Sequence, residues 1–143
     1  MWADLLATHT GELIALLLLL GCSGFFSGTE TALFSLTRGQ LHRLEAAGPS
    51  GRLAAGLMRR PRRVLNTLLL GNMLANVGFA SVAAVLVLDL EQAGARSWEL
   101  ALATVVPLLV LILGGEVTPK MLAITLSQRW ARATAGALAV VQR

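Results

Sequence analysis

Three short motifs place polar and charged residues inside otherwise apolar segments of this 143-residue chain. They are Ser-Gly-Phe-Phe-Ser-Gly-Thr-Glu at residues 23–30, Gly-Asn-Met-Leu-Ala-Asn at residues 71–76 and Gly-Glu-Val-Thr-Pro-Lys at residues 115–120. Carboxylates and carboxamides are costly at membrane depth because lipid cannot hydrate them. Three segments that all carry such groups are expected to gather their oxygen atoms around a polar ligand. A metal cation is the ligand that fits best.

The first motif presents hydroxyl and carboxylate oxygens on one side of a helix. Ser23, Ser27 and Glu30 stand at positions i, i+4 and i+7, which share a helical face. Gly24 and Gly28 lie next to that face and permit another backbone to approach closely. A purely structural interpretation is helix packing through the glycines, with the serines bonded to carbonyls one turn back. That interpretation leaves the carboxylate of Glu30 unexplained.

The second motif presents two carboxamides from a segment that has no charged residue. Asn72 and Asn76 are one helical turn apart, within the apolar run 64–88. Asparagine favours helices poorly and is expensive in lipid. Hydrogen bonding between helices and coordination of a cation by two carbonyl oxygens both account for this pair. The pair alone does not decide between them.

The third motif combines a helix-breaking proline with a charge. Pro119 has no N–H, and its ring crowds the carbonyl of Gly115 four residues earlier. That carbonyl is therefore expected to face a ligand, since irregular backbone at membrane depth is tolerated where it lines a cavity. Glu116 adds a negative charge beside it. Lys120 stands one turn after Glu116, and either forms a structural ion pair with it or extends to the headgroups.

Hydroxyls, amide oxygens, a freed carbonyl and carboxylates form a ligand set for hard cations such as Mg²⁺, Ca²⁺ or Na⁺. The sequence contains no cluster of His and Cys, so zinc and copper are disfavoured, and neither His9 nor His42 is given a role. Mostly neutral ligands bind weakly, which suits a carrier that must release its ion. The candidate ligands are Ser23, Ser27, Asn72, Asn76, Gly115 and Glu116. The roles of Glu30 and Lys120 are left open.

Catalysis is not expected. The sequence has no Walker motif, nucleophile elbow or glycine-rich phosphate loop, so neither an enzyme nor an ATP-driven pump is predicted within this chain. An acid/base pair of Glu30 and Glu116 is the remote alternative, and no substrate is suggested for it.

The elements that must position these residues are membrane spans. The chain is 55% hydrophobic and 14% charged, whereas a soluble domain carries about 25% charged residues. The apolar runs at about 13–36, 64–88 and 100–126 each reach the roughly 20 residues that a helix needs to cross a bilayer. We therefore predict an all-α membrane protein with three transmembrane helices in a single domain, residues 1–143.

Arginine placement predicts the orientation. The loop at 89–99 holds one arginine against three acidic residues, whereas the loop at 38–63 holds seven. The seven are Arg38, Arg43, Arg52, Arg59, Arg60, Arg62 and Arg63. By the positive-inside rule the first loop and the C-terminus are cytoplasmic and the N-terminus is outside, in a multi-pass protein of the cell (inner) membrane. The net charge of +4 is interpreted as attraction to anionic headgroups and not as nucleic-acid binding.

The cytoplasmic loop is expected to contain helices. Gly48-Pro49-Ser50-Gly51 divides it, and leucines at helical spacing flank arginines on either side. We predict short amphipathic juxtamembrane helices within about 38–62 and at about 127–141, lying on the membrane surface. A disordered basic loop is the alternative.

The runs FFSGTETALFSL, GNMLAN and GEVTPK in three successive spans resemble the transmembrane domain of the CNNM/CorC magnesium transporters. The likeness covers about residues 11–140. It departs from the family pattern at Met73, where a second asparagine is often found. The resemblance implies a homodimer with three transmembrane helices in each subunit, which carries Mg²⁺, apparently outward, with Na⁺ proposed as a coupling ion.

The resemblance also implies where the ion is held. Ser23 and Ser27 from the first span, Asn72 from the second and Glu116 from the third take the ligand positions, with Asn76 and Glu30 beside them. Pro119 takes the place of the helix-distorting proline and Lys120 that of the lysine after it.

Family members normally continue into a cytoplasmic pair of CBS domains that bind ATP. Because this chain stops at Arg143, we expect it to hold the membrane domain alone, with ATP acting only through domains absent from it. The alternative function is a membrane anchor or dimerisation module for a cytoplasmic regulatory domain.

Overall fold

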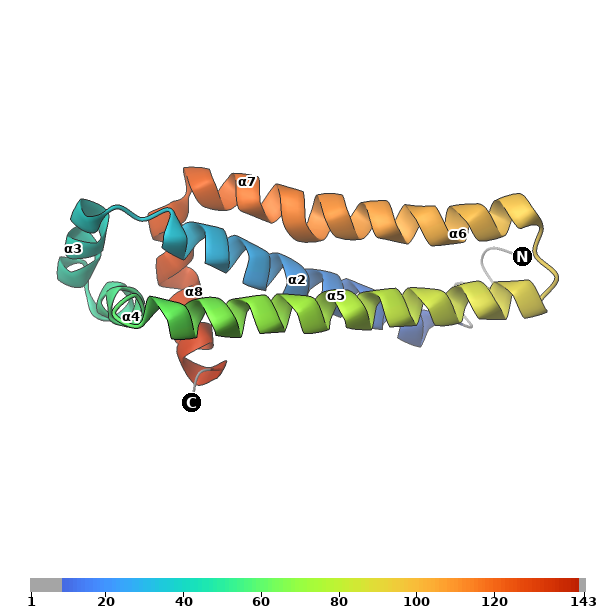
Figure 1. Cartoon of the computed structure of the whole chain (residues 1–143), viewed down its shortest axis with the longest axis horizontal. Helices are drawn as coiled ribbons and strands as arrows, with labels where there is room; N and C mark the ends of the chain where they lie inside the picture. Colours follow the sequence, from blue (N-terminus) through green and yellow to red (C-terminus); the bar gives the residue numbers. More distant parts are fainter. Residues whose placement is uncertain (1–8, 142–143) are drawn as a thin grey trace.

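Three long helices run side by side along the molecule, and shorter helices gather at one end of them (Figure 1). The computed structural model describes residues 9–141. The first span is α2 (Thr10–Phe34) and the second is α5 (Pro61–Gln92). The third span consists of α6 (Ser97–Val110), the π-helical segment η1 (Leu111–Val117) and α7 (Thr118–Thr125). No β-strand occurs between residues 9 and 141.

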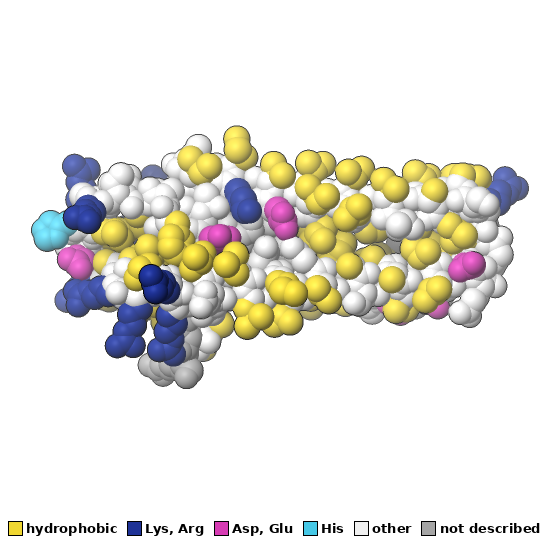
Figure 2. Space-filling view, viewed as in Figure 1, with side chains coloured by type: hydrophobic (Ala, Val, Ile, Leu, Met, Phe, Trp, Pro, Cys, Tyr) yellow, Lys and Arg dark blue, Asp and Glu magenta, His cyan; other side chains and the backbone are white. Residues whose placement is uncertain are grey.

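The prediction of three spans in an all-α protein is confirmed. All three long helices are long and apolar enough to cross a bilayer. The first and third begin about three residues earlier than the apolar runs indicated, and the second extends three to four residues further at each end. Large apolar side chains are exposed along each of them, as expected for surfaces that contact lipid (Figure 2). Examples are Leu17 and Leu18 on α2, Leu70 and Met73 on α5, and Leu102 and Leu113 on the third span.

Local signals set where these helices begin and end. Pro61 opens α5, at a position where its missing N–H has no helical partner to lose. Gly94 ends the turn after α5 with a φ of 80°, a conformation that glycine adopts without steric cost. The backbone N–H of Arg96 then donates to the Glu99 carboxylate at 2.7 Å, which caps the start of α6.

The juxtamembrane helices are ordered, so the alternative of a disordered basic loop is wrong. They are α3 (Arg38–Ala46), α4 (Pro49–Leu57) and α8 (Ser127–Val141). Thr37 caps α3 through a reciprocal pair of hydrogen bonds with Gln40. The break between α3 and α4 falls at Gly48, whose φ is 106°.

A buried apolar cluster fixes α4 and α8 to the ends of the first two spans. It consists of Leu33, Ala54, Val64, Leu68, Ala131, Ala135 and Leu138, which belong to α2, α4, α5 and α8. Because the cluster joins α4 and α8 to the spans, these two helices form one structural unit with the membrane bundle, and α3 packs against α4.

Helix α2 is the centre of the bundle, with contacts to α5, η1, α7 and α8. Ser23, Ser27 and Thr29, which lie halfway along α2 or beyond, are its fully buried polar residues within the described chain. The face that carries the first motif therefore points into the protein and not toward lipid.

Candidate cation site

The hydroxyl of Ser23 is the meeting point of the three spans. Its Oγ lies 2.7 Å from Asn76 Oδ1 and 3.1 Å from Asn72 Oδ1, both on α5. It also lies 3.4 Å from the carbonyl oxygen of Gly115 in η1. Ser23 is 0% exposed. The structure therefore brings a residue from each of the three sequence motifs into contact around the buried Ser23 hydroxyl, with Asn72 and Asn76 partly buried.

Glu116 completes the group through Asn76. The side-chain N–H₂ of Asn76 donates to Glu116 Oε1 at 2.8 Å. A carboxylate accepts hydrogen bonds and does not donate them, so this bond fixes which end of the Asn76 amide faces Glu116. The Oδ1 atom of Asn76 is thereby directed at Ser23, with a negative charge held one hydrogen bond away.

The irregular backbone of the third span has the cause that the sequence indicated. Pro119 supplies no N–H to the carbonyl of Gly115, four residues earlier. The chain widens into a π-helix over Leu111–Val117, and Thr118 N–H bonds to Leu113 O, five residues back. The Gly115 carbonyl, which has lost its α-helical donor, lies next to the Ser23 hydroxyl instead.

The most informative property of this site is the number of hydrogen atoms that its oxygen atoms can share in hydrogen bonds. Four oxygen atoms converge there: Ser23 Oγ, Asn72 Oδ1, Asn76 Oδ1 and Gly115 O. The serine hydroxyl has one hydrogen, which it can donate to one of the three acceptors at a time. With the Asn72 amide in this orientation, two of the three acceptors face the serine oxygen without a proton between them. Such an arrangement is electrostatically suited to a cation.

The comparisons with known proteins identify the family of this chain. The sequence model of the cyclin M (CNNM) transmembrane N-terminal domain matches residues 13–143. This chain belongs to the CNNM transmembrane domain family. It is 33% identical over 112 residues to a UPF0053 protein of Haemophilus influenzae, a match that covers 77% of this chain and 26% of that protein. It is 30% identical over 122 residues to the UPF0053 inner membrane protein YfjD of Escherichia coli, covering 84% of this chain and 27% of the relative. The chain thus spans about a quarter of the length of these relatives.

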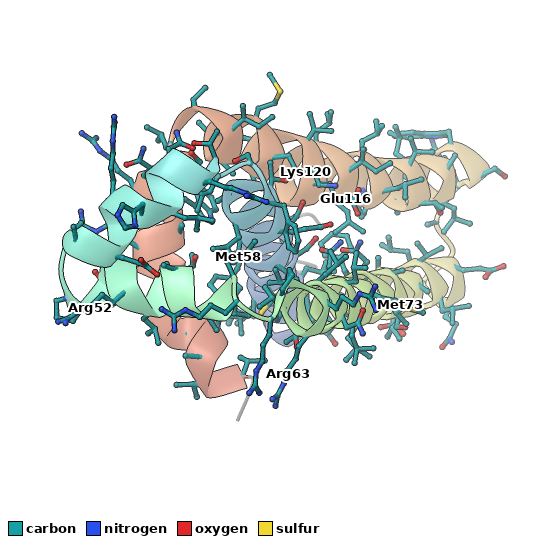
Figure 3. All side chains as sticks on the ribbon, turned by 60° about the vertical axis from the view of Figure 1, so that its left-hand side comes forward. Arg52, Met58, Arg63, Met73, Glu116 and Lys120 are labelled. Carbon is teal, nitrogen blue, oxygen red and sulfur yellow. The ribbon has the colours of Figure 1, made fainter. Side chains whose placement is uncertain are left out.

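Not every predicted residue of this CNNM domain joins the central contact. Ser27 is 0% exposed one turn beyond Ser23, and its hydroxyl has no hydrogen-bond partner among residues 9–141. Glu30, partly buried, makes no hydrogen bond or ion pair within the same residues. Glu116 and Lys120 stand close together on the third span (Figure 3), yet no ion pair joins them in the described chain. The interpretation of these two residues as a structural ion pair is therefore not supported.

Small residues on α2 let the neighbouring elements close around the site. A Cβ atom on Gly24 would lie 3.2 Å from Cγ of Pro119. One on Gly28 would overlap the indole ring of Trp130, whose Nε1–H donates to Thr29 Oγ1 at 3.4 Å. These two glycines therefore bring α7 and α8 of the CNNM domain against the buried face of α2.

Two features of the domain were missed by sequence reasoning. The hydrogen bond between Asn76 and Glu116 was not anticipated, although an amide and a carboxylate in neighbouring spans are a usable signal for one. Sequence reasoning also assigned no role to His9, which the structure places beside Glu12 and Asp89 at the other end of the bundle. The spacing of residues within single helices carried no signal for that group, because one member lies on a different span.

Proposed function

We propose that this domain binds Mg²⁺ between its three spans and carries it across the membrane. The observation that supports the proposal is the cluster of four oxygens around Ser23 with one hydroxyl hydrogen among them and the Glu116 carboxylate beside it. Membership of a family associated with metal-ion transport supports it independently. The proposed ligands are Ser23, Ser27, Asn72, Asn76, Gly115 and Glu116.

The spacing of the oxygens favours a small cation. Octahedral Mg²⁺ holds its ligands at about 2.1 Å, which places neighbouring oxygens about 3.0 Å apart. The three distances from Ser23 Oγ, 2.7, 3.1 and 3.4 Å, lie on either side of that value. Ca²⁺ takes more ligands at longer distances and would require the spans to separate. The close approach of the helices therefore selects for the smaller ion.

The charge of the site suits reversible binding. Glu116 is its one carboxylate, and Asn76 already donates a hydrogen bond to it. The other proposed ligands are neutral hydroxyl, amide and carbonyl oxygens. Neutral ligands hold a divalent cation weakly, so the ion can leave on the far side of the membrane. The unpartnered Ser27 hydroxyl, one turn along α2 from Ser23, offers a further oxygen on the same buried face.

Several parts of this proposal rest on the family resemblance and on the arginine distribution. They are export of Mg²⁺, coupling to Na⁺, a homodimer, and an N-out/C-in topology in the inner membrane with the arginines at anionic headgroups. ATP would act only through cytoplasmic domains outside this chain. The alternative function is a membrane anchor or dimerisation module, in which the packing of α7 and α8 on Gly24 and Gly28 serves only to hold the bundle of each chain together. In that case the polar motifs would serve assembly alone.

The decisive variant is Glu116→Gln. Glutamine keeps the side-chain shape, and its Oε1 still accepts the hydrogen bond from Asn76, so the variant removes charge and little else. We expect Mg²⁺ affinity to fall by about tenfold or more, equivalent to about 1.4 kcal/mol, and transport to fall to background. Calorimetric titration of the purified chain and Mg²⁺ flux from proteoliposomes provide the measurements.

Glu45→Gln is the matched control. Its carboxylate lies in the juxtamembrane region, 3.3 Å from an Arg59 nitrogen, and takes no part in the proposed site. This control should retain both Mg²⁺ affinity and flux. If Glu116→Gln behaves like Glu45→Gln in both measurements, the assignment of the site is wrong.

A further inference from the structure

A second group of ligand-type side chains lies at the end of the bundle away from α8. The Nδ1 atom of His9 is 3.9 Å from Glu12 Oε2 and 3.8 Å from Asp89 Oδ2. The three candidate ligand atoms all lie within 4.8 Å of one another. None of these residues belongs to the proposed Mg²⁺ site.

The fold positions the three side chains from two spans. His9 immediately precedes α2, and Glu12 follows it three residues later on the same face. Asp89 lies in the last turn of α5, which packs along α2. The side chains are 17%, 35% and 40% exposed for His9, Glu12 and Asp89 respectively. They are therefore partly exposed and accessible to an ion, and His9 is the most buried of the three.

The donor types identify the class of ion. Mg²⁺ and Ca²⁺ prefer sites made entirely of oxygen, whereas an imidazole nitrogen with two carboxylates is typical of Zn²⁺ and its neighbours among the transition metals. Three protein ligands also leave a fourth tetrahedral position for water. Tetrahedral Zn²⁺ with ligand distances of about 2.1 Å needs ligand atoms about 3.4 Å apart. Side-chain rotations that shorten the two separations from His9 by about 0.5 Å, and the separation of the two carboxylates by up to about 1.4 Å, would complete the site.

We propose that His9, Glu12 and Asp89 bind one divalent transition-metal cation, with Zn²⁺ as the best fit. The ion would join the start of α2 to the end of α5, because its ligands come from both. It would therefore stabilise the folded bundle by binding it in preference to the unfolded chain. The competing interpretation is a metal-free clamp, in which the His9 imidazole contacts the two carboxylates directly.

The first experiment keeps the site intact. The chain has two histidines, so the variant His42→Ala leaves His9 as the single imidazole. Zn²⁺ is titrated into this variant while the imidazole ¹⁵N resonances are followed by NMR. We expect the Nδ1 resonance of His9 to shift and to saturate at one Zn²⁺ per chain. A resonance that does not respond to Zn²⁺ would overturn the proposal in favour of the metal-free clamp.

The second experiment removes ligands one at a time. His9→Ala and Asp89→Asn should each weaken Zn²⁺ binding tenfold or more in calorimetric titration. Glu91→Gln, an exposed carboxylate two residues from Asp89 on α5, is the matched control and should change Zn²⁺ affinity less than threefold. Unchanged Zn²⁺ affinity in both His9→Ala and Asp89→Asn would refute the assignment.

Two further measurements separate this site from the Mg²⁺ site and from misfolding. Without Zn²⁺, the thermal unfolding temperatures of His9→Ala and Asp89→Asn should lie within a few degrees of that of the parent chain. Addition of Zn²⁺ should raise the unfolding temperature of the parent chain but not those of the two variants. Glu116→Gln should bind Zn²⁺ like the parent chain. Loss of Zn²⁺ binding in Glu116→Gln as well would place the metal at the central site and overturn the proposal.

Discussion

The Ser23 hydroxyl oxygen lies 2.7 Å from Oδ1 of Asn76, although the two residues are 53 positions apart and belong to different spans. This contact excludes the interpretation in which Ser23 bonds to a carbonyl one turn back in its own helix. It also shows that the polar faces of α2 and α5 point toward each other and not into lipid. Residues of the polar motifs therefore form one partly buried group between the helices, which both the carrier and the anchor interpretations must explain.

Gly115→Ala should damage the site while sparing the fold. The new Cβ would lie 2.9 Å from Ser23 Oγ. A serine side chain can rotate away from it, so the conflict is relieved by moving the hydroxyl out of the site and not by moving a helix. We expect Mg²⁺ affinity to fall about tenfold, or about 1.4 kcal/mol, with little change in thermal unfolding temperature. Calorimetric titration and circular dichroism measure the two quantities.

The neighbouring glycine supplies the control for this prediction. A Cβ on Gly114 would come no closer than 3.7 Å to Leu20, which is an ordinary van der Waals contact. Gly114→Ala should therefore leave Mg²⁺ affinity within about threefold of the parent chain, or about 0.7 kcal/mol. Equal Mg²⁺ affinities for the two alanine variants would show that the Ser23 hydroxyl is not a ligand.

Asn72→Ala separates the carrier from the anchor. As a carrier ligand, Asn72 contributes one amide oxygen to the ion, and its removal should abolish Mg²⁺ flux in proteoliposomes while the chain stays folded and keeps its oligomeric state. As an assembly residue, it would be needed for association, and its removal should change the molecular mass of the protein–detergent complex measured by light scattering. A variant that transports Mg²⁺ normally yet no longer associates would favour the anchor.

Pro119→Ala tests the role of the π-helical segment. Alanine restores the N–H that proline lacks, so residue 119 can donate to the Gly115 carbonyl as in a regular α-helix. That carbonyl would then turn away from Ser23. We expect slower Mg²⁺ flux and weaker Mg²⁺ binding, with thermal stability equal to or above that of the parent chain because a helical hydrogen bond is gained. Flux equal to that of the parent would mean that the irregular backbone has no part in transport.

The membrane environment explains why the convergence of the three polar motifs was predictable from the sequence. At membrane depth every polar group carries a desolvation cost, so Ser23, Asn72 and Glu116 stood out in the sequence against their apolar neighbours. The structure brings the three motifs that contain these residues together. The site of the backbone irregularity was predictable for a similar reason, since Pro119 removes a specific hydrogen bond. The length of the π-helix and the direction of the Asn76 amide were not predictable from the sequence, because both depend on contacts between spans.

The convergence of His9, Glu12 and Asp89 was not predictable from the sequence, and the reason is physical. Charged side chains at the ends of spans reach water, so their presence at His9, Glu12 and Asp89 costs little and does not stand out in the sequence. Their convergence depends on how far the start of α2 extends along α5, a property of the packed bundle. The bounds of the helices also differed from the apolar runs, because a helix can continue into polar residues. At the start of α6, for example, the Glu99 carboxylate accepts a hydrogen bond from the Arg96 backbone N–H and caps the helix before the apolar run begins.

Gly28→Ala tests how the juxtamembrane helix α8 is held against α2. Its Cβ would overlap the indole ring of Trp130, a large side chain whose N–H is bonded to Thr29 and which therefore cannot move without losing that bond. We expect destabilisation of about 1–3 kcal/mol from overpacking, seen as a lower thermal unfolding temperature, with a shift of tryptophan emission to longer wavelength as the ring becomes more exposed. Gly21→Ala on the same helix is the control, because no atom lies within 4 Å of its Cβ. Since alanine is the better helix former, this control should be at least as stable as the parent chain. Equal stability of the two variants would show that α8 does not depend on close packing at Gly28.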